Sequence, residues 1–186
     1  MGYSVIADVG NLMVRRLSEH MIPDVIQNEG SIGLCSPEDH GDFRLGLYLY
    51  DISECDEITT RGMMPSGMHQ QKYPSSWLNL YYMITAYSNS DIKYRQEEEQ
   101  KILGRAIQIL KDYSTIGDKE LGSDITMSAK IEPLRMEQND KLRLWNFPNI
   151  PYHLSLFYKV SPVEVASAKV KDIVRVSSVD FTLEER

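Results

Sequence analysis

Cysteine is scarce in this chain of 186 residues, which contains only Cys35 and Cys55. Two cysteines are too few for a disulfide framework, and we expect free thiols, as in a reducing cytosol. The sequence also lacks any run of the roughly 20 apolar residues that a membrane-spanning helix needs. Its start, Met1 to Val5, has no basic region followed by an apolar run, so no signal peptide is predicted. We therefore expect a soluble protein made in the cytoplasm, with no membrane partner.

Positive charge is scarce as well. The chain has 20 Lys and Arg residues against 27 Asp and Glu, which gives a net charge of −7. The densest basic feature is the pair Arg15-Arg16, which is typical of a solvated helix face. Binding to a phosphate backbone needs a basic stripe or patch. Nucleic acid is therefore not an expected partner.

Signatures of catalysis and of cofactor binding are missing too. The pair Gly62 and Gly67 has the glycine spacing of a phosphate-binding loop, but the Lys and Ser/Thr that should follow are absent. No Gly-x-Ser-x-Gly elbow marks a nucleophile. A zinc site needs three or four converging ligands, and neither the cysteines nor the histidines have that spacing. The four histidines are scattered: His20, His40, His69 and His153. We predict no enzyme, no cofactor and no metal.

The expected helix at residues 90–113 has two unusual features, an acidic cluster and an internal glycine. Glu97, Glu98 and Glu99 point about 100° apart on a helix, so they cannot form an acid/base pair. We predict a solvated first turn stabilised by the helix dipole, with a salt-bridging or coordinating role as the alternative. Gly104 costs about 1 kcal/mol in a helix interior. We expect another backbone to pack close to it.

Hydrophobic periodicity predicts an α+β fold with a mainly antiparallel sheet, because helices and strands do not alternate strictly. Ser4 is the expected N-cap of the first helix. Residues 61–76, rich in Gly, Pro, Met and Gln, are expected to form a long loop. Helices are predicted at 4–20, 90–113 and 137–145, and strands at 32–34, 43–52, 77–87, 126–133 and 152–160.

Aromatic residues, by contrast, are abundant. The chain has eleven Tyr and two Trp. Most of the tyrosines fall in expected strands, where core packing explains them. Tyr and Trp are also enriched at protein interfaces, so the remainder suggests contacts with other proteins.

Three stretches together resemble one protein family. They are Leu47–Glu54 (LYLYDISE); Leu78–Tyr87 (LNLYYMITAY) followed by Gln100–Leu110 (QKILGRAIQIL); and Leu142–Trp145 (LRLW) followed by Pro151–Val163 (PYHLSLFYKVSPV). Ile6–Val9 also fits. In this order and spacing they resemble the N-terminal domain of tail-terminator (cap) proteins of extracellular contractile injection systems of the antifeeding-prophage type, which are similar to phage tail terminators. The resemblance assigns residues 1–168 to a tail-terminator-like α+β domain and residues 169–186 to a C-terminal extension.

The resemblance implies a structural role. Such proteins form a ring, expected to be hexameric, on the end of the inner tube, contact the sheath, stop polymerisation and so fix the length of the tail. The implied partners are further copies of the chain, the tube protein, the sheath protein and a second cap protein. The implied location is the bacterial cytoplasm during assembly and then a released, phage tail-like particle. The alternatives are a baseplate or adaptor subunit of the same particle, or a small-ligand-binding α+β domain.

Four residues are nominated for protein interfaces. Arg61, His69 and Gln70 lie in the expected loop at 61–76 and are predicted to reach a neighbour. Phe181 lies in the C-terminal tail, which is predicted to cross to an adjacent subunit or to the sheath. A disordered terminus is the alternative for the tail.

Overall fold

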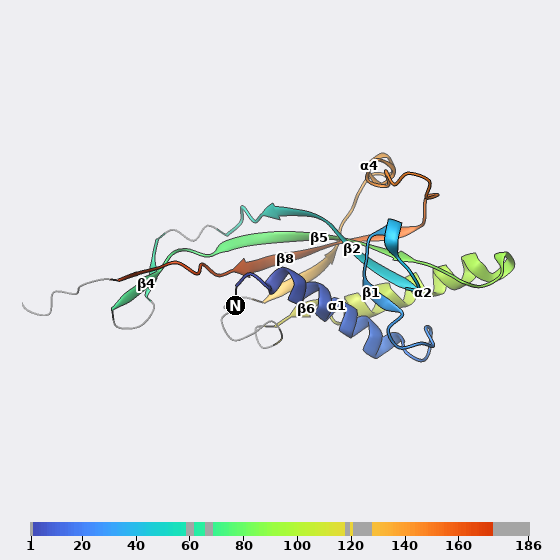
Figure 1. The fold of residues 1–186 in the computed structure, drawn as a ribbon, viewed down its shortest axis with the longest axis horizontal. Helices are drawn as coiled ribbons and strands as arrows, with labels where there is room; N and C mark the ends of the chain where they lie inside the picture. Colours follow the sequence, from blue (N-terminus) through green and yellow to red (C-terminus); the bar gives the residue numbers. More distant parts are fainter. Residues whose placement is uncertain (1, 59–61, 66–68, 118–119, 121–127, 173–186) are drawn as a thin grey trace, which may run out of the picture.

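The computed structural model describes residues 2–58, 62–65, 69–117, 120 and 128–172 (Figure 1). Within these residues the fold is α+β, as predicted. A six-stranded sheet has the order β1-β2-β5-β8-β7-β6, and a three-stranded sheet has the order β3-β4-β9. All neighbouring strands are antiparallel except β1 and β2. The strands are β1 Ile32–Leu34, β2 Leu45–Glu54, β3 Met64–Pro65, β4 Gln70–Lys72, β5 Ser76–Ala86, β6 Thr115–Ile116, β7 Ala129–Pro133, β8 Ser155–Val165 and β9 Val170–Asp172.

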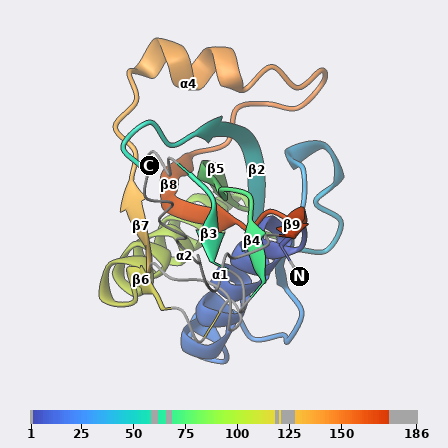
Figure 2. The same cartoon turned by 90° about the vertical axis from the view of Figure 1, so that its left-hand side faces the viewer.

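Two long helices, α1 (Val5–Met21) and α2 (Ile92–Asp112), cover one face of the six-stranded sheet (Figures 1 and 2). A short 3-10 helix spans Pro37–Asp39. The apolar stripes of α1 and α2 are buried against the sheet and form the main core with it. Burying apolar area of this kind is the dominant stabilising term in folding. The core residues contributed by the two helices are Val5, Val9, Leu12, Met13, Leu17, Met21, Ile102, Leu103, Ala106, Ile109 and Leu110.

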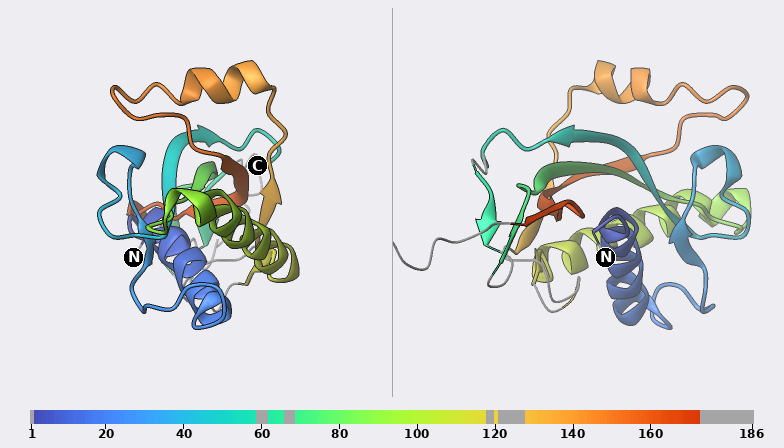
Figure 3. Two further views of the ribbon diagram at one scale, coloured as in Figure 1. Left: turned by 90° about the vertical axis from the view of Figure 1, so that its right-hand side faces the viewer. Right: turned by 60° about the vertical axis from the view of Figure 1, so that its left-hand side comes forward.

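The opposite face of the sheet is covered differently. After β7 the chain leaves the sheet, forms the short helix α4 (Gln138–Leu144) and returns to β8 (Figure 3). Among its described residues α4 buries none. Instead Trp145, which follows the helix, packs with Met83 and Phe157 in a second core cluster. Trp145 is the buried residue that the excursion contributes to this cluster, and partly buried apolar residues on both sides of it pack there too: Leu134, Met136, Leu144, Phe147 and Ile150.

The start of α1 is as predicted, but its cap is not. Ser4 precedes the helix, yet its side chain makes no capping hydrogen bond to the backbone. Its hydroxyl donates instead to the carboxylate of Asp8, at 2.8 Å. The Ser4 hydroxyl is thus directed to Asp8, and the negative charge of Asp8 in the first turn interacts favourably with the helix dipole.

The expected loop at residues 61–76 was partly wrong. β3 and β4 lie within it and join β9 in the small sheet. Strands of two or three residues carry too little alternation to be recognised, and the same is true of β6, which was also missed. β8 runs to Val165 rather than 160, because β5 supplies a partner as far as Ser76. Residues 126 and 127, the first two of the strand predicted at 126–133, lie outside the described part.

The prediction for the acidic cluster was wrong for two of its three members. Glu97 is exposed and pairs with Lys101, 2.6 Å away, as the helical spacing suggests. Glu98, however, pairs with Arg44 at the start of β2 and accepts hydrogen bonds from the hydroxyls of Ser88 and Ser90. Glu99 is buried and accepts from the backbone N–H of Ser88. The cluster ties α2 to the sheet rather than facing solvent.

The expectation for Gly104 was also wrong. A side chain built there would meet no described atom within 4 Å. Gly104 therefore lies on a side of α2 that no other backbone among the described residues approaches. Both cysteines are free, as expected.

Candidate assembly surfaces

The four nominated interface residues are divided by the structure. Arg61 and Phe181 lie outside the described residues. His69 and Gln70 are exposed and lie at the start of the small sheet β3-β4-β9. The side-chain amide of Gln70 donates to the carboxylate of Asp172 on β9, at 3.0 Å. Gln70 thus has a partner within its own chain, and a contact of His69 or Gln70 with a neighbour stays a prediction.

The small sheet sits at one extremity of the molecule. β5 and β8 are eleven residues long and run from the helix-covered core toward it (Figure 1). Between the two sheets, the backbone N–H of Tyr73 donates to the carbonyl of Lys169, at 3.1 Å. The ammonium of Lys169 lies 4.6 Å from the centre of the Tyr73 ring, which adds a cation–π attraction. These contacts make β5, β8 and the small sheet one projecting arm.

Both edges of the six-stranded sheet are blunted. β1 pairs with β2 only as far as Leu47, so from Leu49 onward β2 has no strand partner on that side among the described residues. There the backbone N–H of Ile52 is bonded to the carboxylate of Asp51, at 2.9 Å. At the other edge β7 ends in Pro133, which has no N–H to donate. Features of this kind oppose uncontrolled addition of further strands.

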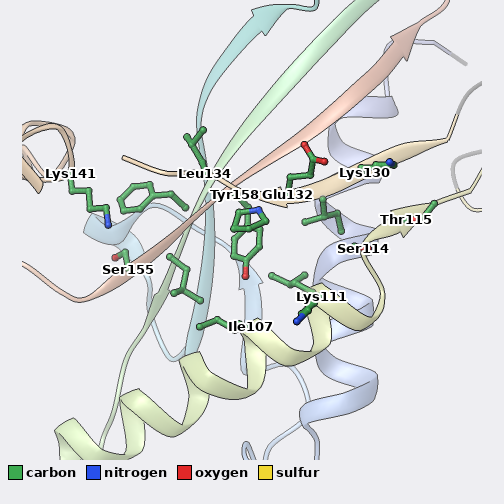
Figure 4. Close-up of a pocket in the computed structure, with 15 residues that line it drawn as sticks. Ile107, Lys111, Ser114, Thr115, Lys130, Glu132, Leu134, Lys141, Ser155 and Tyr158 are labelled. Atoms are coloured by element: carbon green, nitrogen blue, oxygen red, sulfur yellow. The ribbon is translucent and has the colours of Figure 1, made fainter. Parts of the chain in front are cut away.

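A groove of about 810 Å³ opens between α2 and the β7–β8 edge (Figure 4). It exists because β7 stops where Pro133 faces Tyr158, while β8 begins earlier, at Ser155. Residues 155–157 therefore have no strand on their β7 side among the described residues, and the chain that would cover them forms the α4 excursion instead. The apolar lining consists of Ile107, Leu110, Ile131, Pro133, Leu134, Leu156, Phe157 and Tyr158.

The charged groups of the groove are mostly cationic. Lys111, Lys130 and Lys141 lie at its rim with a single carboxylate, that of Glu132, which points away from α2 (Figure 4). The ammonium of Lys141 is held 5.7 Å from the centre of the Phe157 ring. A lysine-rich rim is unusual in a chain with a net charge of −7. The groove thus favours an occupant that is apolar on one side and acidic on the other.

The groove offers no catalytic machinery in its described lining. None of the residues that line it is a histidine or a cysteine. The hydroxyl of Tyr158 points toward α2 (Figure 4), and burial raises the pKa of this group, so it stays a neutral hydrogen-bonding group at physiological pH. Lysines and a neutral phenol without a nucleophile–base pair suit binding rather than reaction. No sequence pattern indicates this groove, because its walls are brought together by the fold from separate segments between residues 107 and 158.

A second cleft, of about 420 Å³, lies where β1 ends beside β2. Leu34 and Tyr3, which line it, are 42% and 83% exposed. Both belong to the large apolar side chains that α1, β1 and β2 leave exposed. Exposed apolar surface next to an open strand is typical of protein contacts.

Across the described residues, no group of three or more His, Cys, Asp or Glu side chains is placed to hold a metal ion. None of the helices in this part of the chain is long and apolar enough to cross a bilayer.

The fold places the chain among α+β proteins of the tail-terminator type. It is similar to the sheath/tube terminator of an extracellular contractile injection system, PVC, in its extended state, with a TM-score of 0.72 and 18% sequence identity over 97% of this chain. It is also similar to the tube-terminating cap of the anti-feeding prophage, with a TM-score of 0.69 and 20% identity over 95% of this chain. The chain spans 64% and 61% of the lengths of these two proteins.

The family follows from the sequence itself. Residues 8–178 match the family described as the Pvc16 N-terminal domain. The chain belongs to this family, which confirms the resemblance drawn from the three sequence stretches. No curated protein matches the chain.

Proposed function

We propose that this protein is a structural cap that terminates the tail of a contractile injection system. In this role it forms a ring, six copies in the expected arrangement, on the end of the inner tube and contacts the surrounding sheath. The observation that carries the proposal is the fold shared with two solved terminators over nearly the whole of this chain. The proposed partners are the tube protein, the sheath protein, further copies of the chain and a second cap protein.

The shape of the subunit suits a ring. Head-to-tail contacts that close by rotation need two different surfaces on each copy. The small sheet β3-β4-β9, at one extremity of the molecule (Figure 1), and the groove between α2 and the β7–β8 edge are two such surfaces. Each stable contact must bury about 1,000 Å² or more, and the exposed Leu34, Ile52 and Leu142 are available for it.

The blunted sheet edges suit a terminator in particular. A protein that ends a polymer must bind the last layer without offering a template for the next one. Asp51 occupies the N–H of its neighbour at one edge, and Pro133 removes a donor at the other. Both features permit side-chain contacts while opposing the addition of strands.

The role is non-enzymatic. Binding surfaces without a nucleophile, a metal cluster or a cofactor cradle in the described part suit an assembly subunit. We place the protein in the bacterial cytoplasm while particles assemble and afterwards in the released particle.

Assembly in vitro tests the proposal. Tube and sheath proteins are polymerised with and without the purified chain, and the particles are measured by electron microscopy with the chain gold-labelled. We expect label at one end of each particle, six copies per end by mass, and shorter particles as the concentration of the chain rises. Light scattering of the free protein shows whether the ring forms before or on the tube.

Two results would overturn it. Label at the baseplate end, in a different copy number, would identify an adaptor instead. A strict monomer that leaves the particles unlabelled would remove any role in assembly, and the groove would then be tested for small ligands, whose pockets have similar volumes.

A further inference from the structure

We propose that the groove between α2 and the β7–β8 edge binds residues 179–184 of a second copy of the chain. This deepens the proposed function, on which it rests, because it names one contact that joins neighbours in the ring. The groove is hereafter the α2 groove, and residues 179–184 are the tail segment.

The first argument is the shape and polarity of the α2 groove. Its floor is apolar, and at its α2 wall Ile107 remains 44% exposed, so the isolated subunit leaves unburied an apolar side chain beside buried Phe157 and Tyr158. Along it, Ser155 and Leu156 of β8 have no strand on their β7 side among the described residues, whereas the carbonyl of Phe157 already accepts from the backbone N–H of Leu134, at 2.8 Å. An extended segment laid there would bury this surface.

The second argument is the sequence of the tail segment. In an extended chain successive side chains point to opposite faces. The segment reads Val-Asp-Phe-Thr-Leu-Glu, so one face is wholly apolar and the other is polar with two carboxylates. The apolar face carries Val179, Phe181 and Leu183, and the polar face carries Asp180, Thr182 and Glu184.

The third argument is charge. Lys111, Lys130 and Lys141 stand at the rim of the α2 groove against the single carboxylate of Glu132. The polar face of the tail segment brings two carboxylates and no cation. Complementary charge across an interface fixes register and speeds encounter. An apolar floor with a cationic rim matches a segment that is apolar on one face and acidic on the other.

The fourth argument concerns which copy supplies the segment. β9, which ends at Asp172, lies at the projecting extremity, whereas β6 and β7 lie near the middle of the molecule in Figure 1 and on the side away from β9 in Figure 2. Six residues lie between Asp172 and Val179, and the seven Cα-to-Cα steps span at most about 25 Å. A segment that starts at the far end of the arm is placed to meet a neighbour rather than its own groove.

Photo-crosslinking of the full-length chain tests this. A benzophenone amino acid replaces Phe181, and heavy-isotope and normal copies are mixed, assembled on tubes and irradiated. We expect cross-links from residue 181 to peptides containing 107–111, 130–134 or 155–158, with heavy and light chains joined. The same probe at Tyr94, which is 62% exposed on α2 outside the groove, is the control and should not label those peptides.

Three outcomes would overturn the inference. Cross-links joining only like isotopes would mean that the segment binds its own chain. Cross-links to the sheath or tube protein would assign the segment to another partner. Absence of cross-links to the α2 groove in assembled rings would leave the segment without this role.

Charge and apolar substitutions give an independent readout by sedimentation velocity. We expect Ile107→Glu and Lys111→Glu to weaken self-association about tenfold or more, which is about 1.4 kcal/mol. Ile92→Glu and Lys93→Glu make the same changes on exposed parts of the same helix outside the α2 groove and should leave association unchanged. Equal losses in both pairs would contradict the inference.

The failure of this inference is distinguishable from failure of the proposed function. Particles that are still capped while residue 181 misses the α2 groove would leave the cap role intact. Heavy–light cross-links to the α2 groove in a protein that never binds tubes would support this inference and contradict the cap role.

Discussion

The guanidinium of Arg16 on α1 holds the carboxylate of Glu120 at 2.8 and 2.7 Å, although 104 positions separate them in sequence. The same guanidinium donates to the carbonyls of Tyr113 and Thr115. Arg16 is only 7% exposed, so it closes the junction between α1, the end of α2 and β6 from the inside. This arginine was expected on a solvated helix face, and that expectation was wrong.

Removing this arginine should therefore be costly. We expect Arg16→Ala to lower the free energy of unfolding by about 1 to 3 kcal/mol, because two carbonyls and the carboxylate of Glu120 lose a donor that is itself buried. Arg15→Ala, which removes a neighbouring arginine with a side chain 59% exposed, should change it by less than about 0.5 kcal/mol. Urea unfolding followed by circular dichroism measures both. Equal effects would show that Arg16 contributes no more than a surface charge.

Glu98 makes stability depend on pH at the acid end. Burial alone would raise its pKa, but hydrogen bonds from Ser88 and Ser90 and the charge of Arg44 lower it overall below the usual 4.5. A carboxyl that binds its proton more weakly in the folded state contributes stability above about pH 4.5, and this is lost as pH falls through the lowered pKa.

We expect Glu98→Gln to be less stable than the parent at pH 7 and to differ less from it at pH 3. Glu97→Gln is the matched control, since Glu97 is fully exposed and its ion pair with Lys101 is screened. Thermal unfolding from pH 3 to pH 7 checks this. A constant gap between Glu98→Gln and the parent would rule out the ionised carboxylate as the cause.

Gly104 offers a gain in stability. A side chain there meets no atom within 4 Å, and the residue lies inside α2. We expect Gly104→Ala to raise the free energy of unfolding of the isolated chain by about 0.5 to 1 kcal/mol. Gly30 also has open space around it but has φ +79°, so Gly30→Ala should be neutral at best. A gain at both positions would mean that backbone strain at Gly30 is negligible.

Trp145 should carry the α4 excursion. Its ring contacts Phe147, Tyr152 and His153, and it is 8% exposed. We expect Trp145→Ala to cost about 3 kcal/mol or more in unfolding free energy. Leu142→Ala, on α4 itself at 49% exposure, should stay within about 0.5 kcal/mol. If the two substitutions cost the same, α4 is held by contacts of its own.

What the sequence predicts well here is strong periodicity. The alternation in β2, β5 and β8 and the stripes of α1 and α2 predicted their positions to within a few residues, because one face of each is buried. Contacts between distant segments could not be predicted. The pairing of Glu98 with Arg44 joins residues 54 positions apart, and no local pattern distinguishes it from a solvated turn.

The sequence predicted that the candidate site would be a protein-binding surface, but it did not predict where on the fold this surface lies. The resemblance led to the family and the fold, whereas the α2 groove arises from where β7 stops relative to β8. That depends on Pro133 and on the α4 excursion, which the sequence shows as a proline and a short helix without their spatial relation. The expectation for Gly104 failed for a related reason. A glycine inside a helix does not by itself show whether another backbone packs against it.

The order of the strands has a consequence for synthesis. β8 is one of the last strands to be made, yet it lies next to β5 near the middle of the sheet, and α1 packs against it. The ribosome therefore releases α1 with its apolar stripe long before Val160 and Val163 exist to cover it. At about 5 to 20 residues per second the nascent chain must keep this stripe from aggregating for many seconds. We expect a nascent chain stopped before β8 to need a chaperone to stay soluble.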